Sequence, residues 1–371
     1  MVMPYQHLHD AVFGRVPILR TTTNEYPIGE DQVQPASIDF RLGQRAFAMF
    51  SAALPHGETV QELIEKYKRF GFELREENIL ERGRTYLVQL FEECSLPEGV
   101  YIQFSPKSST GRCDVFVRVL SDKYSHYDRT PRGYQGKLYL EITPMSFDVH
   151  VKSGLALVQG RFKTPRTRRL EPEELVHLHT KEGIIFNRSG EPLGHSSLNI
   201  SHGNVYFHAD LDRDIVGFAA KGTIAKVLDM REKDKHRTEE FWEPIRRPAD
   251  GNLILEPGRF YLLATKERVR IPNICCGELL SFDITTGEFR VHYAGFFDNG
   301  FGGESGTNGV LEVRVRDVPF RVVDGQPICA MVFEETFEVP SVLYGKNSHY
   351  MKPGPSLSKH FVDRYEAWEK A

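Results

Sequence analysis

The sequence contains one long internal repeat, and this repeat restricts the possible folds more than any other feature. Gly83 to Val88 matches Gly258 to Leu263. The same spacing relates Pro97 to Pro272, so the offset between the copies persists along the segment. Tyr139 to Ile142 matches Val310 to Val313 at a slightly smaller offset. This period is too large for a solenoid of short repeats, so we infer that one β-rich unit has been duplicated.

Both copies consist of short apolar runs separated by glycine and proline. Val100 to Phe104 and Val115 to Val119 alternate, are rich in β-branched and aromatic residues, and predict strands. Helical spacing is rare, and Thr59 to Phe70 shows it most clearly. We therefore predict a mainly β fold with a few short helices, arranged as two β-barrel or β-sandwich domains at residues 1–165 and 166–371.

Composition excludes several classes of protein. The net charge of −4 provides no global field for nucleic acid, so any anion site must be local. No apolar stretch approaches the roughly 18 residues that span a bilayer, and the first residues do not resemble a signal peptide. The five cysteines are odd in number and form no Cys-x-x-Cys, which favours reduced, mostly buried thiols. We expect a cytoplasmic protein with no membrane or nucleic-acid partner.

A polar turn, Ser105 to Arg112, connects the two predicted strands of the first copy. Its hydroxyls, its lysine and its arginine offer donors and positive charge without a carboxylate, which suits an anionic ligand, above all a phosphate. Considered alone, the turn is more simply an ordinary Ser/Gly/Pro turn with solvated basic residues. The second copy has Asp283-Ile284 where the first has Ser108-Ser109, so only the first copy keeps the phosphate pattern.

A second pattern is found only in the second copy. The segment His292 to Gly302 predicts a hairpin, because Asn299-Gly300 is a strong turn dipeptide. Asp298 is equally explained as the residue that starts this turn. The first copy has a basic, tyrosine-rich insertion, Ser121 to Gly136, at the corresponding place.

Four segments together resemble the dCTP deaminase branch of the trimeric dUTPase superfamily, in its double-length bacterial form. They are Gln34 to Gly43, Lys107 to Arg112, Ala294 to Phe301 and Tyr344 to Lys359. In this order they are similar to the family's N-terminal Pro-Ala-Ser strand, its Arg-Ser-Ser-x-x-Arg phosphate motif, its nucleoside hairpin and its C-terminal lid. Lys107 replaces an arginine of the family pattern, Asn299 replaces a proline, and the glutamine of the lid has no clear counterpart.

The resemblance implies two tandem dUTPase-like β-barrel (β-clip) domains and a hydrolase that converts dCTP to dUTP and ammonia, feeding dUTP and dTTP synthesis. It implies that a glutamate serves as general acid and base, that no zinc takes part, and that Mg²⁺ arrives with the triphosphate. The catalytic residues implied are Glu312, Ser108 and Arg112. The substrate-binding residues implied are Lys107, Ser109, Ala294, Asp298, Tyr344, Lys346, Tyr350 and Lys352.

The other class of deaminase uses zinc and carries His-x-Glu followed by Pro-Cys-x-x-Cys. His56-Gly57-Glu58 fits the first half of that pattern, but the chain has no Pro-Cys-x-x-Cys. Cys275 and Cys276 are adjacent, which two ligands of one tetrahedral zinc rarely are. We therefore predict a mechanism without zinc.

Both copies contain a Leu-Glu dipeptide, which ends in Glu141 and in Glu312. The simplest interpretation of each glutamate is an exposed residue on an alternating strand. The hairpin upstream of Glu312 favours a functional role for that residue, whereas Glu141 lacks this hairpin and the simpler interpretation is preferred for it.

Three alternatives stay open at this point. They are a dUTP pyrophosphatase with Asp298 activating water, a bifunctional enzyme that forms dUMP from dCTP, and a nucleotide-sensing module without catalysis. The resemblance also implies that each catalytic site takes residues from the first-half and second-half domains, in a monomer or a homo-oligomer.

Overall fold

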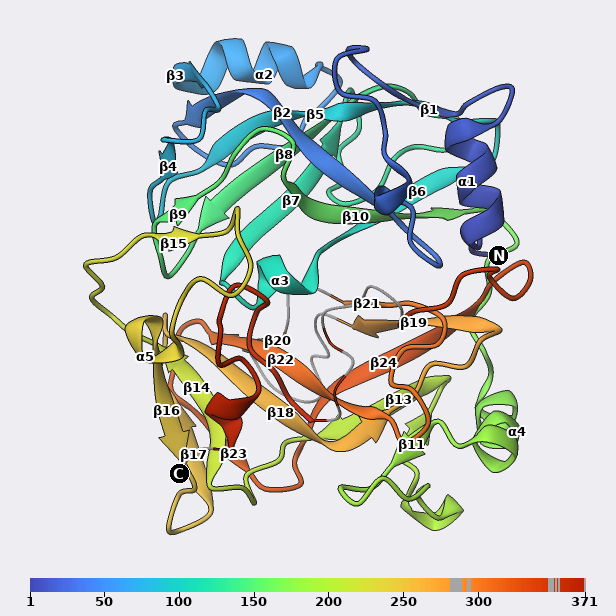
Figure 1. The fold of residues 1–371 in the computed structure, drawn as a ribbon, viewed down its shortest axis with the longest axis vertical. Coiled ribbons are helices and arrows are strands. Elements are labelled where there is room, and N and C mark those ends of the chain that lie inside the picture. Colours follow the sequence, from blue (N-terminus) through green and yellow to red (C-terminus); the bar gives the residue numbers. More distant parts are fainter. Residues whose placement is uncertain (281–288, 292–294, 346–349, 351, 353, 370–371) are drawn as a thin grey trace. The chain divides into compact units, whose positions relative to one another are not determined.

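The computed structural model describes the chain except for residues 281–288, 292–294, 346–349, 351, 353 and 370–371 (Figure 1). It is mainly β with few helices, as predicted. The chain forms two compact units. Unit 1 comprises Met1–Thr167, Lys226–Glu232 and Thr336–Val342, and unit 2 comprises Arg168–Ala225, Lys233–Glu335 and Leu343–Ala371.

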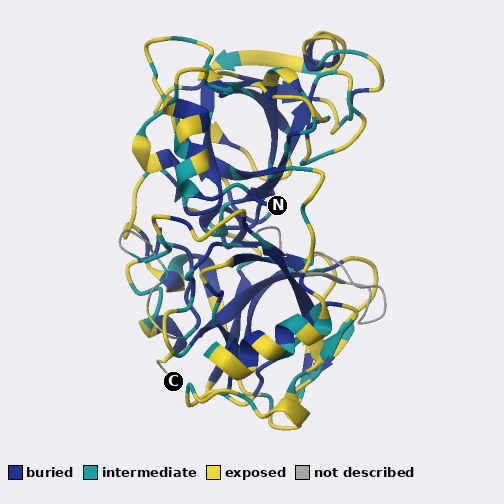
Figure 2. Ribbon diagram, turned by 90° about the vertical axis from the view of Figure 1, so that its right-hand side faces the viewer, coloured by how far each residue is buried: buried dark blue, intermediate teal, exposed yellow. Residues whose placement is uncertain are grey.

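Unit 1 is built on an eight-stranded sheet in the order β6-β10-β2-β5-β8-β7, with β1 paired to β5 and β3 paired to β2. The strands are β1 Leu19–Thr21, β2 Ile38–Met49, β3 Lys68–Glu73, β5 Tyr86–Ser95, β6 Tyr101–Pro106, β7 Val115–Ser121, β8 Gln135–Pro144 and β10 Ala156–Lys163. A small sheet joins β4 Ile79–Leu80, β9 Val149–His150 and β15 Leu228–Asp229. The strands curl around a buried interior (Figure 2).

Helix α2, Val60–Tyr67, shows how local sequence and packing combine in unit 1. Thr59 caps it, because its hydroxyl accepts from the Glu62 N–H while the Glu62 carboxylate accepts from the Thr59 N–H. Val60 and Ile64 lie one turn apart and pack with Phe47 in a buried cluster. The predicted helix of residues 59–70 is therefore correct at its start and too long at its end, where β3 begins.

Unit 2 contains a six-stranded sheet, β16-β14-β18-β22-β20 with β11 on β18, a five-stranded sheet, β12-β13-β24-β19-β21, and the pair β17-β23. The strands of the first sheet are β11 Ile185–Phe186, β14 Ile215–Ala220, β16 Trp242–Arg246, β18 Phe260–Val269, β20 Phe289–Val291 and β22 Thr307–Val315. The others are β12 Ile200–Ser201, β13 Asn204–His208, β17 Asn252–Leu255, β19 Cys275–Leu280, β21 Phe296–Phe297, β23 Phe320–Val323 and β24 Pro327–Glu335. These sheets enclose one large apolar core.

The remaining helices are short. Helices α3 Ser108–Gly111, α4 Pro172–Glu182 and α5 Thr238–Phe241 connect strands, and α1, Tyr5–Phe13, opens the chain. The sequence before Asp31 shows little periodicity, so α1 was not predicted. It buries Leu8, Ala11 and Val12.

The same tyrosine hydrogen bond occurs at matching positions of the two copies. The Tyr86 hydroxyl accepts a hydrogen bond from the Glu81 N–H at 3.0 Å, and the Tyr261 hydroxyl accepts one from the Glu256 N–H at 2.8 Å. These two pairs are related by the same offset that relates Gly83 to Gly258 in the sequence. The two units are therefore copies of one β unit.

Two segments beyond the expected domain boundary belong to unit 1. Strand β15 pairs in parallel with β9, with Leu228 opposite Val149. Thr336 forms a parallel bridge with Val2. The boundary predicted at residues 165/166 lies close to the first crossing of the chain at residue 167, but sequence pattern did not reveal that the chain later returns to unit 1.

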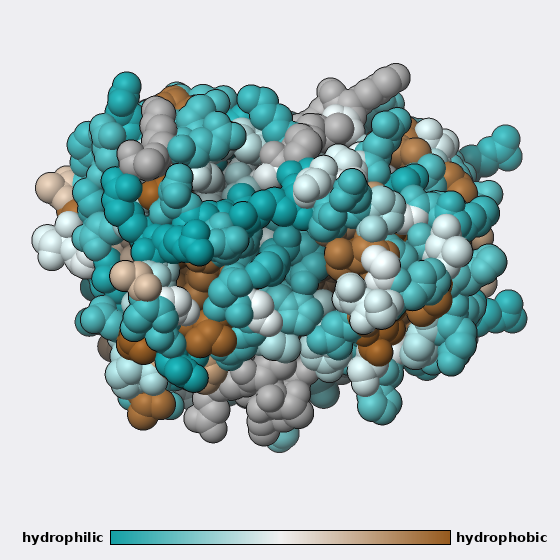
Figure 3. Space-filling view, turned by 90° about the horizontal axis from the view of Figure 1, so that it is seen from below, coloured by the Kyte–Doolittle hydropathy of each residue, from teal (hydrophilic) through white to brown (hydrophobic). Residues whose placement is uncertain are grey.

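The molecular surface and the cysteines fit the composition. Hydrophilic residues cover most of the face in Figure 3, and hydrophobic residues form separate patches there. All five cysteines are buried thiols, as predicted. Within the part of the chain that the structure describes, no helix is both long and apolar enough to cross a membrane.

Candidate active site

The predicted phosphate turn is a well-anchored structure in unit 1. Strand β6 ends at Pro106, and the single helical turn α3 leads into β7. The Lys107 N–H donates to the Leu157 carbonyl at 3.0 Å, and the Thr110 hydroxyl donates to the same carbonyl at 2.9 Å. Ser109 and Arg112 are buried on this turn. The turn that the sequence predicts is therefore fixed to strand β10 and not a loose loop.

Lys107 forms an ion pair with Asp39 of strand β2. This contact joins two of the four segments that carry the family resemblance, the N-terminal strand and the phosphate turn. Asp39 was not among the predicted site residues, although it lies within the motif Gln34 to Gly43. An incoming phosphate must compete with the Asp39 carboxylate for the charge of Lys107.

Glu141, on strand β8, is buried and not exposed. Only 3% of the residue is accessible, so the interpretation as an exposed strand residue is wrong. The Ala53 N–H donates to Oε2 at 3.3 Å, and the Tyr127 hydroxyl donates to Oε1 at 3.4 Å. Burial raises the pKa of Glu141 to about 7, against the lowering effect of these hydrogen bonds. At neutral pH both protonation states of Glu141 are accessible.

The tyrosine-rich insertion, Ser121 to Gly136, folds back over Glu141. Arg118 of β7 pairs with Asp128 at 2.5 Å and lies 4.4 Å from the centroid of the Tyr127 ring. The Val119 N–H donates to Asp128 at 2.8 Å, which ties this segment to the strand. Burial, followed by the charge of Glu141, raises the pKa of Tyr127 above its ordinary range, so the phenol stays protonated and donates.

Glu312 occupies the equivalent position in unit 2. It is 2% accessible, so here too the interpretation as an exposed residue is wrong. Glu312 lies opposite Leu262 in the β18–β22 pair, and Glu141 lies opposite Leu87 in the β5–β8 pair. Leu87 and Leu262 are repeat partners, so both units hold a buried carboxylate at the same place of the same strand.

The predicted hairpin forms a tight turn after β21. The Phe301 N–H donates to the Asp298 carbonyl at 3.1 Å, and Gly300 has a φ of +85°, which favours glycine. The Asn299 side-chain amide donates to the Asn273 carbonyl at 2.9 Å. Asp298 is buried. The hairpin therefore holds the Asp298 carboxylate at a fixed position in unit 2.

The C-terminal segment begins against this hairpin. The Tyr344 N–H donates to the Asn299 carbonyl at 2.9 Å, and the rings of Tyr344 and Phe301 lie 5.1 Å apart. Further along, the Lys359 N–H donates to the Tyr350 hydroxyl at 3.3 Å.

The end of this segment is packed and not loose. The Lys352 amine lies 5.2 Å from the centre of the Tyr365 ring. Leu357 and Phe361 are fully buried. Two predicted substrate-binding residues, Ala294 and Lys346, lie outside the described residues.

The predicted residues thus fall into two groups within the units. Lys107, Ser108, Ser109 and Arg112 share one turn of unit 1, and Asp298 and Tyr344 meet at one hairpin of unit 2. Among the described residues, no group of three His, Cys, Asp or Glu side chains is arranged to hold a metal ion. The absence of zinc from the mechanism stays a prediction.

The fold and these sites define a class of protein: a duplicated, mainly β protein with an anchored polar turn in unit 1, a tight hairpin in unit 2 and a buried glutamate in each unit. The comparison with known families agrees. The N-terminal domain of 2′-deoxycytidine 5′-triphosphate deaminase matches residues 2–166, and the C-terminal domain of the same family matches residues 171–361. The chain belongs to the dCTP deaminase family.

Individual relatives show the same likeness. A "dCTP deaminase, dUMP-forming" from Coprothermobacter proteolyticus is 31% identical over 140 residues, which cover 37% of this chain and 71% of the relative. A dCTP deaminase from Haloarcula marismortui is 27% identical over 143 residues, covering 37% and 70%. The crystal structure of a 2′-deoxycytidine 5′-triphosphate deaminase from Agrobacterium tumefaciens has a TM-score of 0.83 and 35% identity, covering 92% of this chain and 99% of that chain.

Proposed function

We propose that this protein catalyses the hydrolytic deamination of dCTP to dUTP and ammonia. The observation that carries this proposal is the match of both family domains, which together extend over nearly the whole chain. The anchored phosphate turn and the two buried glutamates give that match a chemical basis. The buried thiols favour the cytoplasm as the compartment in which it acts.

The reaction requires a group that moves protons at the cytosine ring. Water attacks C4, N3 gains a proton, and the amine gains a proton before it leaves. One carboxylate can accept the first proton of the water and pass it to N3, and then accept the proton of the new C4 hydroxyl and deliver it to the leaving amine. We assign this role to Glu312, which is buried and follows the hairpin of Asp298 in the same unit. Ser108 and the carbonyl of Ala294 are proposed to hold the water, and Arg112 to support the charge.

Binding of the nucleotide is proposed to use both groups of residues. Lys107, Ser108 and Ser109 bind the triphosphate, which enters as its Mg²⁺ complex. Asp298 accepts a hydrogen bond from the 3′-hydroxyl of the deoxyribose. The tail residues that cover the nucleotide are Tyr344, Lys346, Tyr350 and Lys352.

A second candidate for the proton carrier is Glu141, and a specific observation favours it. Its pKa of about 7 lies near the operating pH, which is where a general acid–base group works best. The Tyr127 hydroxyl and the Ala53 N–H orient its two oxygens.

The activity is tested by incubating the purified protein with dCTP and Mg²⁺ and measuring ammonia, dUTP, dUMP and pyrophosphate. Ammonia with dUTP is expected. Pyrophosphate and dUMP would instead identify a bifunctional enzyme, the activity in the name of the Coprothermobacter relative. Binding of dCTP without release of ammonia would identify a sensing module. Formation of dUMP from added dUTP, with no ammonia released from dCTP, would identify a dUTP pyrophosphatase.

The proton carrier is tested with Glu312→Gln and Glu141→Gln. We expect Glu312→Gln to lower turnover by at least the roughly 10²–10⁴-fold typical of a general acid–base group, because an amide cannot accept a proton. Calorimetry should show that dCTP still binds to this variant. If Glu141→Gln is the inactive variant, the carrier lies in unit 1 and the assignment to Glu312 is wrong.

Zinc is tested separately. A zinc-selective chelator that leaves Mg²⁺ in solution should not change turnover, and metal analysis of the active protein should find no stoichiometric zinc. Loss of activity with the chelator, restored by added zinc, contradicts the proposed mechanism.

A further inference from the structure

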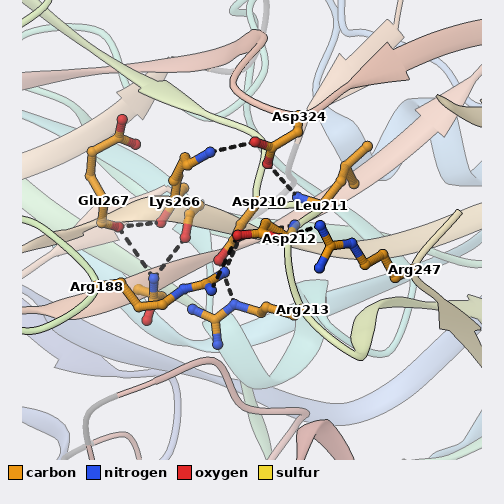
Figure 4. Close-up of polar contacts among 11 residues, drawn as sticks. Arg188, Asp210, Leu211, Asp212, Arg213, Arg247, Lys266, Glu267 and Asp324 are labelled. Atoms are coloured by element: carbon orange, nitrogen blue, oxygen red, sulfur yellow. Dashed lines mark hydrogen bonds and ion pairs between the residues drawn. The ribbon is translucent and has the colours of Figure 1, made fainter. Parts of the chain in front are cut away.

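Unit 2 contains a cluster of arginines that has no role in the proposed deamination (Figure 4). Its centre is Asp210, which is only 1% accessible. Arg188 donates from Nη2 to one oxygen of Asp210 at 2.5 Å, and Arg213 donates from Nε to the other oxygen at 2.5 Å. Burial alone raises the pKa of Asp210, but the two guanidiniums outweigh it and lower this pKa, so Asp210 is an anion.

A second carboxylate completes the acidic part of the cluster. Asp212 pairs with Arg247 at 2.6 Å and lies 3.8 Å from Arg188. Both carboxylates therefore already pair with the arginines around them. In the part of the chain that the structure describes, Arg213 bonds to Asp210 through Nε, and its two terminal nitrogens have no carboxylate partner.

Arg268 of strand β18 lies beside this cluster, because it is opposite Phe186 of β11, two residues before Arg188. Its Nε is buried and has no hydrogen-bond acceptor among the described residues, and no described carboxylate pairs with it. A methyl group on Gly190 would lie 3.3 Å from its Nη1 and 3.0 Å from the Ser305 side chain, so the guanidinium lies beside these two residues. Burial first, and then the cations Arg213 and Arg188, lower the pKa of Arg268.

Three guanidiniums, those of Arg188, Arg213 and Arg247, thus contact two carboxylates, and Arg268 lies beside them without a described carboxylate partner. Glu267, the next residue along β18, pairs with His208. A neighbouring carboxylate, Asp324, forms its own ion pair with Lys266. A partly buried cation without a partner is unfavourable, and an oxyanion with two charges removes both the unused donors and the excess charge. Guanidinium groups match the oxygens of phosphate in a bidentate geometry, which makes phosphate the best-fitting ligand class.

We propose that Arg268, Arg213 and Arg188 of unit 2 bind a phosphate group, with the Ser305 hydroxyl as a further donor. The phosphate group belongs either to free inorganic phosphate or to a nucleotide. None of these residues is assigned to deamination, so the proposal does not depend on the proposed function.

The test is calorimetry on the full-length chain, titrated with inorganic phosphate and with dUTP at constant ionic strength. The background is a Lys107→Ala, Ser108→Ala, Ser109→Ala chain, which removes the three side chains proposed to bind the triphosphate in unit 1. We expect Arg268→Ala to weaken binding in this background about tenfold to a hundredfold, as the loss of a charge-assisted contact predicts. Arg268→Lys keeps the charge but lacks the paired N–H donors of the guanidinium, so it should lower the affinity by an intermediate amount.

Arg247→Ala is the matched control, because Arg247 belongs to the same cluster but is 61% exposed and paired with Asp212. It should change binding by less than about threefold, since an exposed charge is screened by solvent. Binding of phosphate alone identifies the free anion as ligand, and binding of dUTP alone identifies a nucleotide. The proposal is overturned if neither ligand binds or if Arg268→Ala has the same affinity as the background chain. It is also overturned if Arg247→Ala lowers the affinity as much as Arg268→Ala does. If Arg268→Ala does not fold, the comparison of Arg268→Lys with Arg247→Ala decides.

Discussion

Glu141 shows how burial changes the chemistry of one side chain. Because the folded protein raises its pKa to about 7 from an ordinary 4.5, the folded state holds a proton between these pH values that the unfolded chain releases. Stability therefore falls as pH rises from about 4.5 to about 7. The integrated loss is on the order of 3 kcal/mol, and below about pH 4.5 this contribution no longer changes.

Replacing Glu141 with glutamine should remove this dependence. We expect the free energy of unfolding of Glu141→Gln, measured with urea, to vary less between about pH 5 and pH 8 than that of the parent, by on the order of 3 kcal/mol. Glu77→Gln, which changes an exposed carboxylate of the same unit, is the control and should keep the parental slope. A Glu141→Gln variant with the parental slope would show that the buried carboxyl titrates normally.

The sequence could not reveal this burial. Alternation assigns one face of a strand to solvent, but Leu138 to Ile142 are buried on both faces. Loops cover the face of the strand that carries Glu141. Ala53 and Tyr127 contact Glu141 from segments that are remote in the chain or have no regular sequence pattern. The residue types of the phosphate turn, in contrast, are local information, and the turn was predicted at the right place.

The hairpin that follows β21 is the element on which nucleoside binding depends in the proposed function. Its glycines differ in what surrounds them. Gly302 has a φ of +91°, and a Cβ there would lie 2.3 Å from the Val269 carbonyl oxygen. Gly303 has a φ of +58° and open space around it. Of these two glycines, Gly302 is the one at which a side chain meets both backbone strain and a steric clash.

These two glycines form a matched pair for a test of the hairpin. Gly303→Ala should cost about 1 kcal/mol of stability through backbone strain alone. Gly302→Ala should cost clearly more, and should weaken dCTP binding because Asp298 shifts with the turn. Thermal unfolding and calorimetry measure the two effects. Equal losses in both variants would mean that strain, and not the contact with Val269, governs the hairpin.

Element boundaries were less predictable than element types. The apolar residues Phe70 and Phe72 fit the end of a helix and a strand equally well, so residues 59–70 looked like one helix. Residues 68–73 form a strand because they pair with β2, where Phe72 lies opposite Ala46. Strand β2 precedes helix α2 in the sequence, so this pairing is not visible in the local pattern. The local sequence pattern therefore predicts short strands and helix caps, whereas long-range strand pairing determines where each element ends.

On the scale of the whole molecule, the duplication has left different motifs in the two copies. The phosphate turn persists in unit 1 and the hairpin of Asp298 in unit 2, while both units keep the buried glutamate. We propose that turnover requires groups from both copies. This division of motifs can be predicted from the sequence, because it depends on which residue types each copy contains and not on their positions in space.

Complementation between variants tests this requirement. Ser108→Ala and Glu312→Gln chains should each be inactive, since each lacks one required group. Mixing them should restore no activity if one chain must carry both groups, and part of the activity if two chains can share them. Full activity of either variant alone would show that its residue is dispensable.

The return of the chain to unit 1 affects how the protein is made. Val2 leaves the ribosome long before its partner Thr336, because most of unit 2 is translated between them. Strand β9 likewise has to wait for β15. Domains ordinarily fold one after another as they emerge, yet here the first unit completes its pairing only after most of the second has been synthesised. A nascent chain that has been translated only as far as residue 335 therefore still has an unfilled pairing position at Val2.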